Sequence, residues 1–199
     1  VFQYLGYMFH LDTGLVSPPR ERWLKVREFI QQFLQERDQT ANRWQQLLGH
    51  LTAMEKLVPL GMLHMRPLQY NLQSQWQQTL DSPAQRVSIT GSSQATLQWW
   101  QDESKVMEGV PFTPPPPTTE VFTDASNLGW GGHLNGETIA GVWTEIEAAR
   151  HINWLELEAV RLTLLSFAES LQHQVVRIST DNTTVVAYIN AQGGTHSPS

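Results

Sequence analysis

The chain has 199 residues, 40% hydrophobic and 16% charged, enough for one large or two small domains with an apolar core. It contains no cysteine, which excludes disulfides and thiolate metal sites. The formal net charge of −6 means that the chain lacks the strongly basic balance that directly indicates nucleic-acid binding.

The acidic excess lies entirely in the second part of the sequence. Residues 1–118 contain 10 Lys+Arg and 10 Asp+Glu, whereas residues 119–199 contain 3 and 9. This excess suits a carboxylate metal site, but it is more often an ordinary solvated surface. Charge alone therefore does not decide between the two.

The ends of the sequence suggest part of a longer protein, since it starts at Val1 without an initiator Met and stops at Ser199 without a clear domain end. No signal-peptide pattern opens it, and no apolar run approaches the roughly 18 residues of a membrane span. We expect an intracellular protein, in the cytoplasm or nucleus, with no membrane partner.

The first 112 residues predict a short β-hairpin followed by helices. Apolar residues 2–9 and 15–16 flank the turn residues Asp12-Thr13-Gly14. Helical spacing of apolar residues and the flanking Pro and Gly residues, including Gly61 and Pro67 as breaks, predict helices over 20–38, 40–57, 68–80 and 92–105. Four prolines at 114–117 then predict an extended linker.

Downstream of the prolines the pattern predicts the order β-β-β-α-β-α. A strand over 121–123 ends at Asp124, and Asn135-Gly136 predicts a hairpin between 128–134 and 138–144. Asn153 is the expected N-cap of a helix to Leu171. The expected buried face of this helix consists of Leu157, Val160, Leu164, Ala168 and Leu171. A strand over 175–180 and a helix over 183–191 follow.

Three acidic residues, Asp124, Glu156 and Asp181, stand at the junctions of these elements. If the first and fourth strands are parallel neighbours, Asp124 and Asp181 lie at the same sheet edge, and the long helix brings Glu156 close. Crowded carboxylates repel one another unless a cation lies between them, and Mg²⁺ prefers oxygen ligands. The sequence therefore predicts a divalent-metal site.

Each carboxylate also has a purely structural alternative. Asp124 would stabilise the turn at residues 124–126, and Asp181 would cap the following helix. Glu156, three residues after Asn153, would complete a capping box. The coincidence of all three at compatible junctions favours the metal site.

The same residues carry a resemblance to a known family. Thr123-Asp124-Ala125-Ser126 with Gly129-Trp130-Gly131-Gly132, Glu156-Leu157-Glu158-Ala159, and Thr180-Asp181-Asn182 resemble three motifs of retroelement ribonuclease H domains. The resemblance implies catalytic, metal-binding roles for Asp124, Glu156 and Asp181, with Glu158 as the rival of Glu156. Residues 187–190 and 192–195 resemble more narrowly elements of the DIRS and related retrotransposon types, that is, DIRS-like or LTR-type elements.

The upstream half fits the same family. Tyr4-Leu5-Gly6-Tyr7 resembles the hairpin that holds the primer end in reverse transcriptases, and residues 48–51 and 65–68 resemble the thumb and connection. The resemblance implies an end of the polymerase palm at 1–17, a helical thumb and connection region at 18–112, a proline-rich linker at 113–119 and a truncated α/β ribonuclease H-like domain with a mixed sheet at 120–199. The family's fourth acidic ligand is expected after Ser199.

The implied activity is hydrolysis of the RNA strand of an RNA–DNA hybrid with two Mg²⁺ or Mn²⁺ ions, Asp124 bridging both. The implied partners are the hybrid and the remainder of a reverse transcriptase polyprotein, which would also be an RNA-directed DNA polymerase. We expect weak or absent nuclease activity from these 199 residues alone. The alternative function is a catalytically inactive, retroelement-derived module for nucleic-acid binding or assembly.

Other candidate functional residues carry less specific signals. Arg20, Arg22, Lys25 and Arg27 are candidates for phosphate contacts, although a solvated helix face is an equal alternative. The tryptophans of the helical region would stack on bases or, as their helical spacing favours, form its core. The histidines show no paired zinc-ligand spacing, and His196 is either a loop residue with a function or part of a solvated tail.

Overall fold

A computed structural model describes residues 1–194. The chain forms two compact units, residues 1–113 together with 191–194, and residues 114–190. The predicted α/β class, with a mixed sheet and helices, is confirmed. The end of the expected nuclease-like domain, including His196, lies outside the described residues. Within residues 1–194 no helix is both long enough and apolar enough to cross a bilayer.

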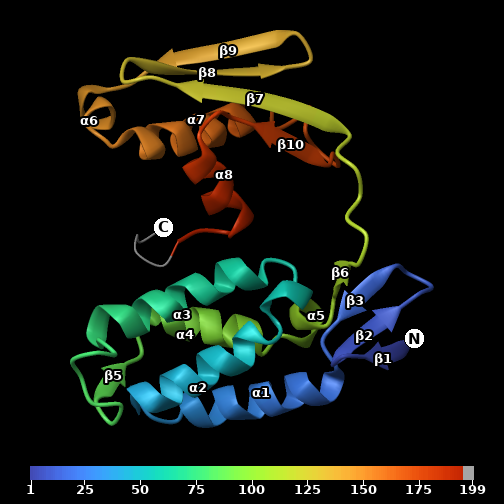
Figure 1. Ribbon diagram of the computed structural model, residues 1–199, viewed down its shortest axis with the longest axis vertical. Helices are drawn as coiled ribbons and strands as arrows, with labels where there is room; N and C mark the ends of the chain where they lie inside the picture. The colour runs from blue at the N-terminus through green and yellow to red at the C-terminus, as the bar shows by residue number, and fades with distance from the viewer. Residues whose placement is uncertain (195–199) are drawn as a thin grey trace. The chain divides into compact units, whose positions relative to one another are not determined.

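Helices dominate the first unit (Figure 1). They are α1 (Arg20–Phe33), α2 (Ala41–Thr52), the 3₁₀ helix η1 (Glu55–Leu57), α3 (Gly61–Gln75), α4 (Gly91–Trp100) and α5 (Glu103–Val106). In α1 the residues at helical spacing, Trp23, Val26, Ile30 and Phe33, are all buried, as the sequence predicts. They join Trp44, Trp100 and the apolar faces of α2 and α3 in one core.

The predicted helix boundary at residue 38 is wrong, because α1 ends at Phe33. The residues beyond it form strand β4 (Asp38–Thr40), which pairs with β5 (Arg86–Ser88), a partner that local sequence does not reveal. The buried Gln39 side chain donates a hydrogen bond to the Phe33 carbonyl at 2.8 Å and so satisfies the helix end. Thr40 then caps α2. The rest of the predicted 40–57 helix is divided between α2 and η1.

Two residues predicted to separate helices, Gly61 and Pro67, belong to α3 itself. Gly61 begins the helix, where a Cβ would lie 2.3 Å from the Glu55 carbonyl oxygen, so the close packing on η1 requires glycine. Pro67 lies within the helix instead of preceding it. The predicted bounds of 68 and 80 are therefore both wrong, since α3 runs from Gly61 to Gln75. The predicted 92–105 helix is divided into α4 and α5. Asp102 is the N-cap of α5, and its Oδ1 atom accepts a hydrogen bond from the Ser104 backbone amide at 3.0 Å.

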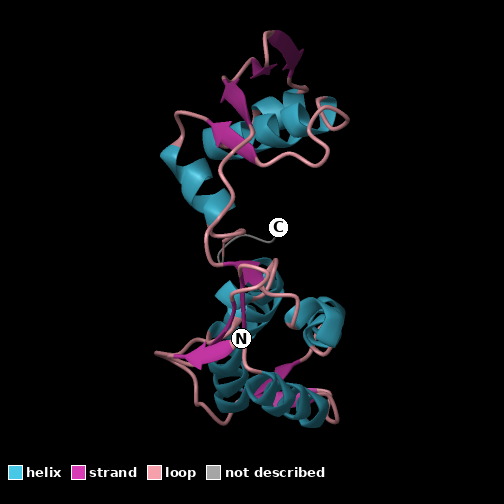
Figure 2. Ribbon diagram, turned by 90° about the vertical axis from the view of Figure 1, so that its right-hand side faces the viewer, coloured by secondary structure: helices cyan, strands magenta, loops and turns pink. Residues whose placement is uncertain are grey.

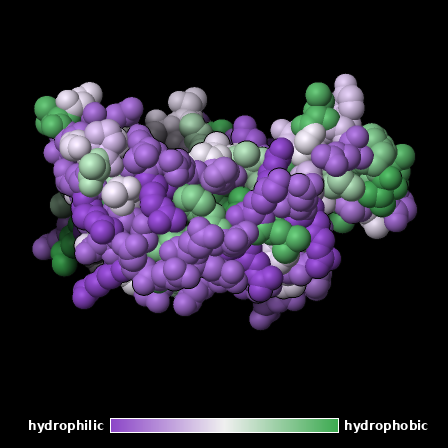
Figure 3. All heavy atoms as spheres, turned by 90° about the horizontal axis from the view of Figure 1, so that it is seen from below, coloured by the Kyte–Doolittle hydropathy of each residue, from purple (hydrophilic) through white to green (hydrophobic). Residues whose placement is uncertain are grey.

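The N-terminal segment forms two hairpins instead of the one predicted. Strands β1 (Phe2–Tyr4), β2 (Tyr7–His10), β3 (Leu15–Ser17) and β6 (Val110–Pro111) make an antiparallel sheet in that order. Leu5 and Gly6 have φ of 48° and 80°, as a two-residue hairpin turn requires. Several large apolar residues of these hairpins are exposed, and Figure 3 shows apolar side chains gathered where the hairpins lie.

The second unit is a four-stranded mixed sheet with helices. Its elements are β7 (Thr119–Ala125), β8 (Gly129–Leu134), β9 (Glu137–Val142), α6 (Glu145–Ala148), α7 (Ile152–Ser166), β10 (Val176–Ser179) and α8 (Thr183–Asn190). The strand order is β10-β7-β8-β9, with β10 and β7 parallel and the other pairs antiparallel. Helix α7 lies along one face of this sheet (Figures 1 and 2).

The buried face of α7 differs from the predicted one. The helix buries Leu155, Glu156, Ala159, Val160 and Thr163, so of the predicted face only Val160 is fully buried. The sheet beneath it is glycine-rich: a Cβ on Gly132 would lie 2.3 Å from the Thr163 Cγ2 and Oγ1 atoms. Such close approach selects small side chains at this contact, and the helix has further leucines, Leu157, Leu162, Leu164 and Leu165, that are only partly buried or exposed.

Both predicted ends of this helix are also wrong. His151, not Asn153, is the N-cap, and its Nδ1 atom accepts from the Asn153 amide at 3.1 Å. The helix ends at Ser166, before the predicted Leu171, because Phe167 leaves the helical conformation and packs into the core with Val121 and Leu134.

Candidate metal centre

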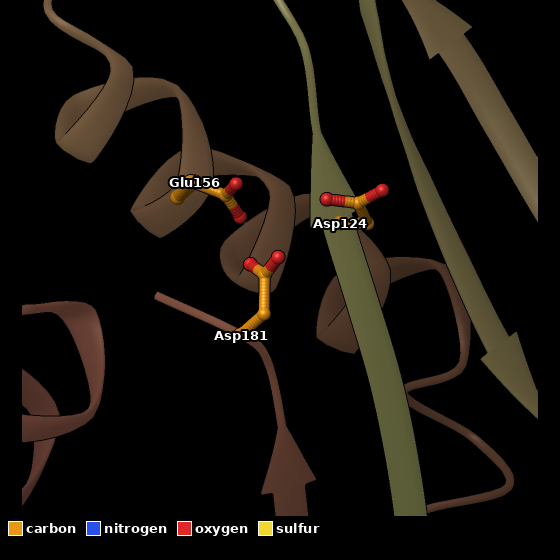
Figure 4. Close-up of side chains that lie close together, drawn as sticks. All are labelled: Asp124, Glu156 and Asp181. Carbon is orange, nitrogen blue, oxygen red and sulfur yellow. The ribbon is translucent and has the colours of Figure 1, made fainter. Parts of the chain in front are cut away.

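Asp124, Glu156 and Asp181 converge at one edge of the second unit (Figure 4). Asp124 lies near the end of β7, and Asp181 follows β10. Because Val176–Ser179 pair in parallel with residues 119–122 of β7, both strands end at the same sheet edge. Glu156 comes from the early part of α7, which packs on β7. One carboxylate oxygen of each residue lies within 4.8 Å of the other two, as the sequence predicts.

The local structural role proposed for Asp124 is filled by Ser126. The Ser126 Oγ accepts from the backbone amides of Leu128 and Gly129 at 3.2 and 3.3 Å, and so closes the turn after β7. The carboxylate of Asp124 is exposed at the sheet edge.

The helix-capping alternatives for the other two carboxylates are likewise filled by neighbours. His151 caps α7, so Glu156 is not the return partner of an Asn153 capping box. Asn182 caps α8, because its Oδ1 accepts from the Val185 amide at 3.1 Å. Neither Glu156 nor Asp181 is therefore needed to cap a helix.

Glu158, the sequence rival of Glu156, faces elsewhere. Its two carboxylate oxygens form a bidentate pair with Arg161, one turn later on the same helix, with distances of 2.5 and 2.8 Å. The acidic cluster contains Glu156 and not Glu158.

The electrostatics of the cluster are dominated by Glu156, which is only 4% exposed, whereas Asp124 and Asp181 are exposed. Burial raises the pKa of Glu156 above its ordinary value, and the negative charges of Asp124 and then Asp181 raise it further. A hydrogen bond from the Ala125 backbone amide acts in the opposite direction. Ionising Glu156 therefore costs free energy in the absence of a compensating cation.

The donor set fits a hard divalent cation. The Oε2 atom of Glu156 is buried and has no hydrogen-bond partner, which is unfavourable for a carboxylate oxygen unless a cation or proton satisfies it. Three carboxylates are the type of ligand that Mg²⁺ and Mn²⁺ prefer. These residues are therefore suited to bind such an ion.

A groove of about 590 Å³ runs beside two of the carboxylates. Asp124 and Asp181 line it together with residues of β7, β8 and β9, among them Phe122, Gly131 and His133. Phe122 is 48% exposed and its ring centroid lies 6.0 Å from that of His133. The groove leaves the two exposed carboxylates open to solvent.

Sequence reasoning missed a contact between two asparagines next to the cluster. The Nδ2 atom of Asn182 donates to the Oδ1 atom of Asn153 at 3.0 Å. Asn153 precedes Glu156 by three residues, and Asn182 follows Asp181 directly. The polar residues beside two predicted ligands were the available signal, but their pairing depends on the packing of α7 against the segment after β10.

The four basic residues predicted to contact phosphate all lie on α1. Arg20 pairs with Glu103 at 2.9 Å, and Lys25 pairs with Glu21 at 2.8 Å. Arg22 donates to the Ala53 carbonyl at 3.4 Å, and the Arg27 guanidinium lies 5.4 Å from the centre of the Trp23 ring. Contact with phosphate stays a prediction for this helix.

The tryptophans of the helical unit are mostly core residues, which is the structural alternative that their spacing favours. Trp23, Trp44 and Trp100 are at most 1% exposed, and Trp76 is 6% exposed. Trp99 is partly buried and stacks on His64, with ring centroids 3.7 Å apart. The buried rings are unable to stack on nucleobases without unfolding of the core.

Comparison with known proteins gives solved structures alone. No protein-family model and no curated protein matches the sequence. The foamy viral protease-reverse transcriptase in complex with dsDNA is similar with a TM-score of 0.43 and 15% identity, over 94% of this chain and 38% of that chain. The same viral protein in complex with RNA/DNA hybrid is similar with a TM-score of 0.43 and 13% identity, over 96% of this chain and 26% of that chain. The chain thus spans well under half the length of these proteins.

Proposed function

We propose that residues 114–190 belong to a ribonuclease H-type region of a retroelement reverse transcriptase, which hydrolyses the RNA strand of RNA–DNA hybrids with divalent metal ions. The observation that carries this proposal is the convergence of Asp124, Glu156 and Asp181, whose oxygens lie within 4.8 Å of one another at the shared end of two parallel strands. The motifs around these residues resemble that family.

The three carboxylates would hold the divalent ions, for which Mg²⁺ or Mn²⁺ fits the oxygen ligands. Such ions, when bound in pairs, activate a water molecule and stabilise the leaving oxygen of a phosphodiester. The residues themselves supply a fixed negative site: Glu156 is held in the core by α7, and the two aspartates are open to the groove. A phosphodiester would reach the metal from the groove that Asp124 and Asp181 line.

Preference for RNA would come from contacts to the 2′-hydroxyl groups and the wide minor groove of the hybrid. The net charge of −6 argues against strong binding of phosphates by this chain on its own. Other parts of the parent protein, and the bound cations, would then supply most of the attraction to nucleic acid.

The first test is metal binding, measured by titration calorimetry with Mg²⁺ and with Mn²⁺ on the 199-residue chain. We expect binding to be at least roughly tenfold weaker in Asp124→Asn, because one ligand charge is lost. Glu137→Gln is the matched control, since Glu137 is an exposed carboxylate on β9 of the same unit. Equal affinities for the wild type and Asp124→Asn would contradict the proposed centre.

The second test is cleavage of an end-labelled RNA–DNA hybrid, with single-stranded RNA and duplex DNA as comparison substrates. It should be run on the 199 residues and on a chain extended beyond Ser199, where the family resemblance puts a fourth acidic ligand. Mg²⁺-dependent cleavage that Asp124→Asn abolishes is the expected result for the extended chain. Hybrid binding with metal-independent affinity and no cleavage would instead favour the alternative, a non-catalytic nucleic-acid-binding module.

A further inference from the structure

We propose that the Asn153–Asn182 amide pair positions Glu156 and Asp181 for metal binding, so that the cluster is assembled before a cation arrives. This inference rests on the proposed function, because it assigns the pair a role in the same centre. The pair links the first turn of α7 to the segment between β10 and α8 through one hydrogen bond of 3.0 Å. Both residues are partly buried.

The segment that carries Asp181 is fixed on both sides by the residues next to it. The Thr180 Oγ1 atom accepts from the Asn182 backbone amide at 3.2 Å. The Asn182 side chain uses both ends of its amide: Oδ1 accepts from Val185 at the start of α8, and Nδ2 donates to Asn153. Asp181 thus lies between two residues that bond to each other, and one of them, Asn182, is also bonded to α7 and α8, although the Asp181 carboxylate itself is exposed.

The Glu156 side of the bridge is fixed in a similar way. The backbone amide of Asn153 donates to the Nδ1 atom of the capping His151, and the Asn153 Oδ1 atom accepts from the Asn182 side chain. Asn153 and Glu156 are three residues apart on one helix and therefore lie on the same side of its first turns. The bridge consequently joins the backbones that carry two of the three carboxylates.

An uncharged bridge suits this position. Without a cation, Glu156 and Asp181 repel each other and would tend to separate the segment after β10 from α7. A bond between two amides opposes this separation and adds no charge to the cluster. Groups that orient metal ligands commonly change metal affinity by roughly 10- to 100-fold when they are removed.

The experiment measures the affinity for Mn²⁺ by electron paramagnetic resonance of free and bound ion in the 199-residue chain. Asn153→Ala removes the acceptor and leaves the α8 cap in place, whereas Asn182→Ser keeps a capping hydroxyl and removes the donor. We expect each variant to weaken binding roughly tenfold. Gln174→Ala is the matched control, because it removes the hydrogen bond with Thr118 before β7 and β10 begin, at the other end of the sheet.

The double variant separates positioning from general destabilisation. If the two asparagines act through their shared bond, Asn153→Ala has no further effect on the Mn²⁺ affinity in the Asn182→Ser background. Additive losses, or unchanged affinity in either single variant, would overturn the inference. If Asn153→Ala fails to fold, the test is the NMR signals of the Asn182 side-chain NH₂ group in the metal-free wild type. Fast exchange of both protons with solvent would show that the bond to Asn153 is not formed and would overturn the inference.

The outcomes distinguish this inference from the proposed function. Failure of the wild type to bind Mn²⁺ contradicts the metal centre itself. Binding by the wild type that is lost in Asp124→Asn but retained in both asparagine variants contradicts the positioning role alone.

Discussion

Replacing the buried carboxylate Glu156 by glutamine should stabilise the second unit in the absence of metal while removing its metal affinity. The substitution keeps the shape of the side chain and removes a charge that burial, Asp124 and Asp181 all disfavour. For two full charges 4.8 Å apart, Coulomb's law gives about 3.5 kcal/mol at an effective dielectric constant of about 20, and about 0.9 kcal/mol in bulk water. Since both aspartates are exposed, we expect a net gain of about 1–3 kcal/mol at pH 7.

The effect should depend on pH in a defined direction. The pKa of Glu156 is raised in the folded protein, so folding favours the protonated form of this side chain. The resulting contribution to the free energy of unfolding is present below the ordinary pKa of 4.5 and is lost as the pH rises through the raised value. The metal-free wild type should therefore lose stability relative to Glu156→Gln as the pH is raised from 4.5 toward neutrality. At lower pH, where Glu156 is protonated in both states, the two proteins should converge.

Segment-resolved hydrogen exchange in the presence of EDTA measures this for residues 114–190 of the whole chain. When Mg²⁺ replaces EDTA at a concentration of 100 times its Kd, the wild type should be stabilised by about 2.7 kcal/mol and Glu156→Gln should not. Glu158→Gln is the control on the same helix: it removes a carboxylate that Arg161 already pairs, so no gain is expected. Equal or lower stability of Glu156→Gln than of the wild type at pH 7 would refute the reasoning about a strained carboxylate cluster.

Two substitutions test the packing of the units. Gly132→Ala should destabilise residues 114–190 by about 1–3 kcal/mol in thermal or denaturant unfolding, because its Cβ would lie 2.3 Å from Thr163 side-chain atoms. The control Gly131→Ala should have little effect, since its Cβ would meet nothing closer than 3.8 Å. Equal effects of the two substitutions would contradict this packing. Trp44→Ala should cost about 3–5 kcal/mol, measured by hydrogen exchange of the helical unit, because the ring is fully buried and lies edge-on to Phe33 at 4.9 Å. An undiminished protection of α1 and α2 would show that this core contact is not important.

The convergence of the carboxylates could be predicted because it depends on few assumptions. A strand that ends in Asp124 and another that ends just before Asp181 need only be parallel neighbours to meet at one edge. The local alternatives were chemically reasonable, but each role belongs to a residue one to five positions away, such as Ser126, His151 and Asn182. Single-residue placement of turns and caps depends on where each element starts, which sequence patterns define only within a few residues.

The helix boundaries failed where distant segments decide them. Residue 38 is the predicted end of the first helix and residue 40 the predicted start of the second, but residues 38–40 form a strand that pairs with residues 86–88, nearly fifty positions later. Gly61 and Pro67 are breakers by composition, yet packing on η1 requires the first and α3 accommodates the second. In these segments tertiary contacts outweigh local propensity, and the propensity differences involved are only about 1 kcal/mol for glycine and about 3 kcal/mol for proline.

The buried face of α7 shows how the fold and the candidate site depend on the same residues. The helix is apolar on most sides, so its sequence pattern does not define which side faces the sheet. The sheet decides, because Gly132 admits Thr163 at a distance that a Cβ would forbid. Thr163 and Glu156 are seven residues apart, two helical turns, and so lie on the same face of α7. The contact that brings Thr163 onto the glycine therefore also turns the carboxylate of Glu156 toward Asp124, and any substitution that lifts α7 from Gly132 should weaken the metal centre as well as the core.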